Sequence, residues 1–303
     1  MHDLAIIGAG PAGLSAGLYA ARYKLDTVIF EKMSIGGQII LSSEIENYPG
    51  FPGGISTLEL IERMHKHIGE YGLDVTTGKV SAIKEAQGGY VLSCDNKEIF
   101  VKSVILACGA SPKRLGAKGE DKFIGRGISY CATCDGPLFK NKEVAVIGGG
   151  DRAFEEAEFL TRYAAKVSII HRRNAFRASE VLQERVRKNP KIELILEHTV
   201  EEVEGAARLE KIKLKNVKTN EIISRKFDGL FIFVGIAPNT QFLSGFVKTD
   251  GDGFIECVED LVTSKKGIFV AGDCRKKKLY QVITAASDGA IAAQAAHQYI
   301  LGA

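Results

Sequence analysis

Residues 4–13 read Leu4-Ala5-Ile6-Ile7-Gly8-Ala9-Gly10-Pro11-Ala12-Gly13. The four apolar residues at the start predict a short buried strand, and the alanine- and leucine-rich residues 14–22 predict a helix. The glycines between them allow a tight turn and a close approach of the backbone to a pyrophosphate, which the N–H groups of the helix N-terminus can bind. A second expected strand, at residues 26–30, ends at Glu31, whose carboxylate can accept hydrogen bonds from a ribose. A turn that is merely rich in glycine is the alternative, but strand, helix and acid in register predict a nucleotide-binding unit.

The same order of elements recurs in the middle of the chain. An expected strand at residues 143–147 leads into the turn Gly148-Gly149-Gly150-Asp151-Arg152, and a helix is expected from about residue 154 to 163. The next strand ends in a basic tip instead of an acid, with the cations His171, Arg172, Arg173 and Arg177. Arginines bind a phosphate through bidentate hydrogen bonds, whereas a carboxylate would repel it, so this unit is expected to prefer NADPH over NADH. A solvated basic turn is the alternative interpretation.

Two units with different strand tips predict two different nucleotides, FAD in the first and NADPH in the second, a layout that passes a hydride from nicotinamide to flavin. Further strand patterns end near residues 108 and 234, and an alanine-rich helix is expected over residues 284–301. We therefore predict an α/β fold with two Rossmann-like domains of the three-layer ββα type, in which an inserted NADPH domain splits the FAD domain. The expected ranges are 1–112 and 244–303 for the FAD domain and 113–243 for the NADPH domain.

The composition argues against several other classes of protein. The chain has 303 residues, 45% of them hydrophobic and 25% charged, which suits two soluble domains with separate cores. The net charge of +3 is too small to recruit nucleic acid. No apolar run approaches the roughly 20 residues that span a bilayer, and the first residues lack the pattern of a signal peptide, so we expect a cytoplasmic location.

Among the six cysteines, only Cys131 and Cys134 form a close pair. A structural zinc ion needs four ligands. The sequence has neither a second pair of cysteines nor suitably spaced histidines, so we expect no metal. The C-x-x-C spacing instead favours a short-loop disulfide that is accessible to exchange, with two reduced cysteines at a helix start as the alternative. Asp135 is either a general acid for a departing thiolate or a residue of an Asp-Gly turn. The other four cysteines are expected to be small buried hydrophobes.

Together these motifs resemble the low-molecular-weight thioredoxin reductases of bacteria and archaea, class II of the pyridine nucleotide-disulfide oxidoreductases, over essentially the whole chain. The most specific of them is Cys131-Ala132-Thr133-Cys134-Asp135-Gly136, just before the second glycine turn. The glutathione reductase branch differs, since it carries its disulfide in the first domain. The other matching stretches are Gly8–Gly13, Gly36-Gly37-Gln38, Glu46-Asn47-Tyr48-Pro49-Gly50, Gly148–Gly150 with Glu155-Glu156-Ala157, His171–Arg173 with Phe176-Arg177-Ala178, and Gly272-Asp273 with Gln281.

The resemblance implies a thioredoxin-disulfide reductase that passes electrons from NADPH through FAD and the Cys131–Cys134 disulfide to thioredoxin. It implies that Cys134 faces the flavin, that Cys131 attacks the disulfide of thioredoxin and that Asp135 donates a proton. It also implies a homodimer and a rotation of the NADPH domain about linkers near residues 113 and 244. The residues that it assigns to FAD are Gly8, Gly10, Pro11, Ala12, Gly13, Glu31, Gly36, Gly37, Gln38, Asn47, Asp273 and Gln281. Those that it assigns to NADPH are Gly148, Gly150, Asp151, Arg152, His171, Arg172, Arg173 and Arg177.

Two residues depart from the family pattern. Arg152 stands where the family usually has serine or threonine, and Tyr280 stands where it usually has arginine. A different electron donor is therefore a second hypothesis, which leaves the dithiol chemistry unchanged. A third changes the acceptor to a glutaredoxin-like protein or a peroxiredoxin system. A fourth is a flavin-binding redox sensor without fast turnover, for which the basic run Arg275–Lys278 would be a docking patch rather than a solvated loop.

Overall fold

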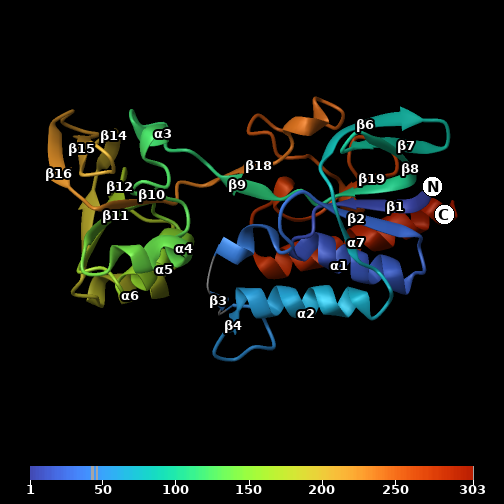
Figure 1. Cartoon of the computed structure of the whole chain (residues 1–303), viewed down its shortest axis with the longest axis horizontal. Helices are drawn as coiled ribbons and strands as arrows, with labels where there is room; N and C mark the ends of the chain where they lie inside the picture. The colour runs from blue at the N-terminus through green and yellow to red at the C-terminus, as the bar shows by residue number, and fades with distance from the viewer. Residues whose placement is uncertain (42–43, 46, 303) are drawn as a thin grey trace. The chain divides into compact units, whose positions relative to one another are not determined.

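Figure 1 shows the computed structural model, which describes residues 1–41, 44–45 and 47–302, with the backbone alone at residues 41, 133 and 134. The chain forms two compact units. The first combines Met1–Ser111 with Ala237–Ala303, and the second comprises Pro112–Ile236. The two connections between the units pair with each other as the short strands β9 (Ala110–Pro112) and β18 (Ile236–Pro238). Residues 237–243 thus lie with the first unit.

The first unit is built on a seven-stranded sheet in which a parallel part continues into an antiparallel part. In the parallel part β1 lies between β2 and β8, β5 follows β2, and β19 pairs with β8. The antiparallel part is the meander of β6, β7 and β8. The strands are β1 (His2–Ile7), β2 (Thr27–Glu31), β5 (Val75–Thr77), β6 (Val80–Ala86), β7 (Gly89–Cys94), β8 (Lys97–Leu106) and β19 (Ile268–Val270).

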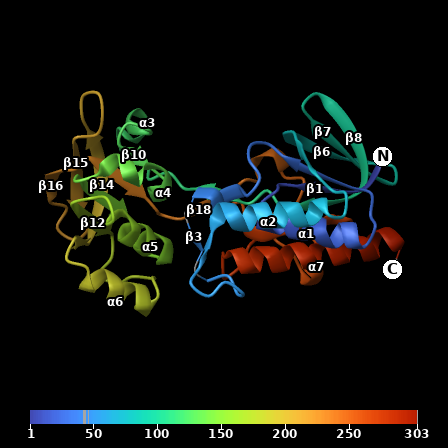
Figure 2. The ribbon, with the colours of Figure 1, turned by 60° about the horizontal axis from the view of Figure 1, so that its bottom comes forward.

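Alternating residues of the parallel strands build two cores in the first unit. Leu4 and Ile6 pack with residues of α1 (Pro11–Arg22) and α7 (Val282–Leu301), whereas Ala5 and Ile7 pack with residues of β6 and β7. Both helices, together with α2 (Thr57–Gly69), lie on one face of the sheet (Figure 2). The shorter elements are η1 (Gly37–Leu41), β3 (Glu44–Ile45), β4 (Ile55–Ser56), η3 (Gln241–Leu243), η4 (Glu259–Leu261) and η5 (Gly272–Cys274).

The second unit has a fully parallel sheet in the order β10-β17-β11-β12-β13. Val144 and Val146 face α5 (Asp151–Leu160) and α6 (Glu180–Lys188), and Ala145 and Ile147 face a separate antiparallel sheet of β14, β15 and β16. The strands are β10 (Ile128–Ser129), β11 (Glu143–Ile147), β12 (Lys166–His171), β13 (Ile192–Leu196), β14 (His198–Glu204), β15 (Lys211–Asn216), β16 (Ile222–Lys226) and β17 (Gly229–Ile232). The short helices are α3 (Glu120–Phe123), α4 (Ala132–Asp135) and η2 (Gly136–Phe139).

Each unit therefore consists of helices, a parallel sheet and a second β layer. This confirms the predicted fold class of two Rossmann-like units with three layers. The arrangement also brings the ends of the parallel strands to one edge in each unit, where open α/β sheets bind their ligands. Among the described residues, no helix combines the length and the apolar character needed to cross a bilayer.

Candidate nucleotide and dithiol sites

The first glycine turn joins β1 to α1 and leaves almost no room for side chains. Gly8 has a φ of +111°, and a Cβ there would lie 2.2 Å from Ala107 O. A Cβ on Gly13 would lie 1.8 Å from Gly8 O. Gly10, the N-cap of α1, faces Gly37, whose added Cβ would lie 3.4 Å from Gly10 Cα. The turn is thus a narrow backbone cradle at a helix N-terminus, which is the geometry that binds a pyrophosphate.

Glu31 is held next to this turn by two backbone hydrogen bonds. Its Oε2 accepts from the Ala9 N–H at 2.9 Å, and its Oε1 accepts from the Met33 N–H at 3.1 Å. The carboxylate is therefore fixed at the end of β2, where an acid can face a ribose. Gly36 joins the same turn, because its N–H donates to Ala9 O at 2.8 Å. Gln38 Oε1 is buried with no hydrogen-bond partner among the described residues, an acceptor that a ligand donor would satisfy.

Residues from the end of the chain complete this edge of the first unit. Asn47 Nδ2 donates to Gln281 Oε1 at 3.1 Å, and Gln281 is the N-cap of α7. The turn after β19 reaches the first turn of α1, since a Cβ on Gly272 would lie 2.8 Å from Ala12 Cβ. Asp273 follows directly in that turn. The residues expected from the sequence to hold FAD therefore lie together in one unit.

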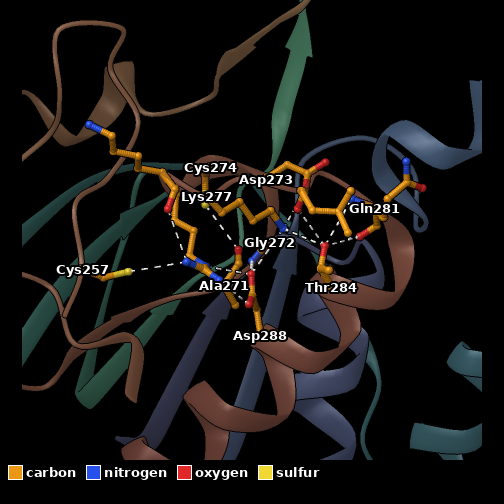
Figure 3. A network of polar contacts seen from close by, with 12 residues as sticks. Cys257, Ala271, Gly272, Asp273, Cys274, Lys277, Gln281, Thr284 and Asp288 are labelled. Carbon is orange, nitrogen blue, oxygen red and sulfur yellow. Dashed lines mark hydrogen bonds and ion pairs between the residues drawn. The ribbon is translucent and has the colours of Figure 1, made fainter. Parts of the chain in front are cut away.

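A network of largely buried charges, which the sequence analysis missed, connects Asp273 with α7 (Figure 3). Asp288 on α7 accepts from Arg275 Nε at 2.9 Å and from Arg275 Nη2 at 2.8 Å. It also accepts from the Gly272 N–H at 3.0 Å. Lys277 Nζ lies 3.0 Å from Asp273 Oδ1 and 3.4 Å from Asp288 Oδ2. The network therefore ties the turn that carries Asp273 to the long C-terminal helix.

This network corrects the interpretation of the basic run 275–278 as either a docking patch or a solvated loop. The side chains of Lys277 and Arg275 are only 5% and 20% exposed, so the interpretation holds only for Lys276 and Lys278, which are exposed. A sequence signal was present. Asp288 is the only acid in the alanine-rich helix 282–301. A carboxylate on a buried helix is costly unless it is paired, so its presence predicts a buried cation nearby.

The C-x-x-C segment begins at Cys131, two residues after the edge strand β10, and continues into the short helix α4. Cys131 is disulfide-bonded and buried. Its N–H donates to Ser129 Oγ at 3.0 Å, and the Ser129 hydroxyl donates to Cys131 O at 3.0 Å. The Asp135 N–H donates to Cys131 O at 3.2 Å, and Ala132 is part of the core of the unit. The side chain of Cys134 lies outside the described residues. Cys131 is therefore held by hydrogen bonds next to the edge strand of the parallel sheet.

The four remaining cysteines are free thiols. Cys94 and Cys274 are buried as expected, whereas Cys108 and Cys257 are only partly buried. A side-chain hydrogen bond with Cys274, together with burial, raises the pKa of Cys108 well above its ordinary value, and burial raises the pKa of Cys94 and Cys257. Because thiolates and not thiols attack disulfides, these three residues are poor candidates for the redox chemistry.

We expect a thiol titration to distinguish the two classes of cysteine. Protein purified without reductant and denatured in an alkylating agent should take up label at the four free thiols. After reduction of the Cys131 disulfide, two further labels should appear on the peptide that contains Cys131 and Cys134. Mass spectrometry of the intact chain and of its peptides measures both numbers. Six labels before reduction would show that the pair is a dithiol at rest.

The second glycine turn joins β11 to α5 and is open at the helix N-terminus. Gly150 is the N-cap of α5, and a Cβ added there would meet nothing within 4 Å. Asp151, expected at the NADPH site, accepts a hydrogen bond through Oδ1 from the Ser179 N–H at 2.6 Å. Ser179 is the N-cap of α6. The Asp151 carboxylate thus joins two helix N-termini.

The tip of β12 packs against this turn and presents unpaired cations. A Cβ on Gly149 would lie 2.4 Å from the His171 ring, and His171 Nε2 is buried with no partner in the described part of the chain. Burial lowers the pKa of His171, and the charges of the neighbouring arginines lower it further, so the ring is neutral at pH 7. Within the described ranges, no hydrogen bond or ion pair engages the exposed guanidinium groups of Arg172, Arg173 and Arg177.

Arg152, the other cation of the turn, is directed away from this tip. Its guanidinium carbon lies 5.4 Å from the ring centroid of Phe233, directly after β17. Its Nε and Nη2 are buried and have no hydrogen-bond partner among the described residues. Among all the residues that the structure describes, no group of three or more histidine, cysteine, aspartate or glutamate side chains is placed to hold a metal ion.

Comparison with known proteins agrees with these geometries. A family model described as pyridine nucleotide-disulphide oxidoreductase matches residues 2–289. A curated thioredoxin reductase of Treponema pallidum (strain Nichols) is 44% identical over 299 residues, which cover 99% of this chain and 97% of the relative. The crystal structure of Lactococcus lactis thioredoxin reductase matches with a TM-score of 0.97 at 39% identity and covers 100% of both chains. A ferredoxin-flavin thioredoxin reductase from Clostridium acetobutylicum matches at 31% identity with a TM-score of 0.55, over 100% of this chain and 99% of that one.

The sequence identity extends over almost the whole chain and the likeness in fold over all of it. The resemblance inferred from the motifs is thereby confirmed, and the chain belongs to the pyridine nucleotide-disulphide oxidoreductase family, within it to the thioredoxin reductases.

Proposed function

We propose that this chain is a thioredoxin-disulfide reductase that takes electrons from NADPH and passes them through FAD and the Cys131–Cys134 pair to thioredoxin. One observation carries the proposal. The disulfide-bonded Cys131 follows β10, and the strands β11 and β12 of the same parallel sheet carry the second glycine turn and its arginines. The two nucleotides would supply hydride transfer and transient storage of two electrons.

The first unit suits FAD in both shape and polarity. The backbone cradle of Gly8 to Gly13 would hold the pyrophosphate, and Glu31 would hold a ribose. The unpartnered Gln38 Oε1 would accept a hydrogen bond from the bound group. The flavin half of FAD would lie toward Asn47, Gln281 and Asp273.

The second unit suits NADPH because its strand tip offers three unpaired arginines and no acid. Arg172, Arg173 and Arg177 can bind a 2′-phosphate with charge-assisted hydrogen bonds. The neutral His171 packs on the glycine turn and has a free ring nitrogen to offer. We therefore expect NADPH to bind at least about ten times more tightly than NADH, which lacks the 2′-phosphate.

The dithiol chemistry requires residues of this chain, the disulfide of the acceptor and a source of two electrons, which NADPH would supply through FAD. Two electrons and two protons convert the Cys131–Cys134 disulfide into a dithiol. The Cys131 thiolate then attacks one sulfur of the thioredoxin disulfide and forms a mixed disulfide with it. Cys134 attacks Cys131 in this mixed disulfide, which forms the Cys131–Cys134 disulfide again and releases reduced thioredoxin. Asp135, one helical turn from Cys131, would protonate the departing thiolate. A homodimer in the cytoplasm and a rotation about the two linkers belong to the same proposal.

Anaerobic titration of the purified flavoprotein tests this function. NADPH should bleach the flavin absorbance, NADH should do so only at higher concentration, and added oxidised thioredoxin should restore the colour. Turnover with a glutaredoxin-like protein or a peroxiredoxin, but not with thioredoxin, would reassign the acceptor. Normal reduction of the flavin without turnover of any disulfide protein would favour a redox sensor.

A second candidate function changes only the electron donor. Tyr280 replaces the usual arginine, and its ring packs at 5.6 Å from that of Phe254, with Lys277 Nζ at 5.6 Å from its centroid. One relative is a ferredoxin-flavin thioredoxin reductase, so a protein donor is the natural competitor of NADPH. If neither nicotinamide nucleotide reduces the flavin while reduced ferredoxin does, this candidate replaces the first.

A further inference from the structure

We propose that Arg152 binds the phosphate on the nicotinamide side of NADPH, and so serves as a second phosphate-binding arginine in place of the usual small hydroxyl residue. The inference rests on the proposed use of NADPH by the second unit. It assigns to Arg152 a task different from that of Arg172, Arg173 and Arg177, which face the 2′-phosphate.

The order of strands separates the two tasks. β11, which carries the glycine turn, lies between β12 on one side and β17 on the other. The arginines at the tip of β12 occupy one side of the turn, and Arg152 extends over Phe233 at the end of β17 on the other. A dinucleotide lies across such a turn with its adenosine ribose toward the tip of the second strand. The nicotinamide half must therefore pass the side where Arg152 lies.

The surroundings of Arg152 leave two of its N–H groups without a partner and compensate its charge only in part. Its Nε and Nη2 are buried and unpartnered in the described part of the chain, and a contact with the Phe233 ring satisfies neither N–H group. Burial lowers the pKa of Arg152, and the nearby Glu156 and Glu155 only partly oppose this effect. The residue also lies in the first turn of α5, where the helix dipole disfavours a cation.

These costs identify an anion as the missing partner. A buried guanidinium with free N–H groups is costly in the unliganded protein, and a bound phosphate would satisfy the charge and the donors together. The open N-terminus of α5 at Gly150 offers that phosphate further N–H groups. In the complex, the phosphate thus gives the Arg152 guanidinium the negatively charged hydrogen-bond acceptor that it lacks in the free protein.

The test compares two ligands and three variants of the oxidised holoenzyme by isothermal titration calorimetry. NADP⁺ carries both halves of the dinucleotide without reducing the flavin, and adenosine 2′,5′-bisphosphate lacks the nicotinamide half with its phosphate. Arg152→Ser should weaken NADP⁺ binding by about 10- to 100-fold and change the affinity for the bisphosphate less than about twofold. Arg152→Lys should lose less. Arg173→Ser, the matched control, should weaken both ligands by similar factors.

Thermal unfolding of the unliganded variants gives an independent readout. Arg152→Ser should unfold at about the same temperature as the parent, because it removes two buried donors without a partner and also the cation beside Glu156 and Glu155. Unchanged NADP⁺ binding by Arg152→Ser would overturn the inference, and tighter binding would in addition make Arg152 an obstacle to the nucleotide. Equal weakening of both ligands would also overturn it. A parent protein that binds neither ligand would instead refute NADPH as donor, and the inference would fall with it.

Discussion

Replacing Cys131 with serine should abolish thioredoxin reduction while NADPH still bleaches the flavin. Under the proposed function, Cys131 provides the thiolate that attacks thioredoxin, and a serine hydroxyl at pH 7 is not ionised enough to replace it. We expect turnover to fall by at least about three orders of magnitude, as is usual when a catalytic nucleophile is removed. Stopped-flow absorbance measures flavin reduction, and a coupled assay with excess NADPH measures thioredoxin turnover.

Cys257→Ser provides the matched control, because Cys257 is a free and partly buried thiol outside the C-x-x-C segment. This variant should retain turnover within about a factor of two. Substantial thioredoxin reduction by Cys131→Ser would mean that the electrons leave through another group. A parallel loss of flavin reduction would mean that the substitution had damaged nucleotide binding rather than the thiol exchange.

Sequence reasoning predicted those parts of the fold and site that depend on neighbours along the chain. Each glycine turn lies between a strand and a helix, so its residues are positioned by local structure alone. The same holds for Glu31, which is the last residue of β2, and for the arginines of the basic tip, which follow the end of β12 by one to six residues. The second β layer was predicted, but its strands were not placed in the sequence, although Lys211-Ile212-Lys213-Leu214-Lys215 shows the alternation typical of a half-buried strand.

The remaining features depend on contacts between segments far apart in the chain. The Asp151 carboxylate turns to the N-terminus of α6, and nothing near Asp151 in the sequence indicates that. Whether Arg152 points to the basic tip or to Phe233 is decided by packing at the end of β17. Lys277 and Lys278 are neighbours of the same type, yet only Lys277 meets two carboxylates and becomes buried. The pattern of residue types cannot separate these cases, because burial is set by the tertiary fold.

Replacing Asp288 with alanine should lower the free energy of unfolding of the first unit by roughly 3–5 kcal/mol. Asp288 is 6% exposed and is the shared partner of Arg275 and Lys277, whose side chains are also largely buried. Its removal leaves two buried cations with Asp273 as the remaining carboxylate of the network, and Asp273 is 33% exposed. Urea-induced unfolding followed by circular dichroism measures the change, and release of flavin fluorescence reports on the nucleotide edge of the same unit.

Two further variants separate charge pairing from the loss of packing. Glu59→Ala removes an exposed partner of Arg63, whose side chain is 62% exposed, and should cost less than about 1 kcal/mol. The triple change of Asp288→Leu, Arg275→Met and Lys277→Met replaces the three most buried charges of the network by apolar groups, and it should recover most of the stability lost by Asp288→Ala. Parent-like unfolding of Asp288→Ala would contradict this account of the network. If the triple variant unfolds as early as Asp288→Ala, the loss arises from packing at the start of α7 and not from the unpaired cations.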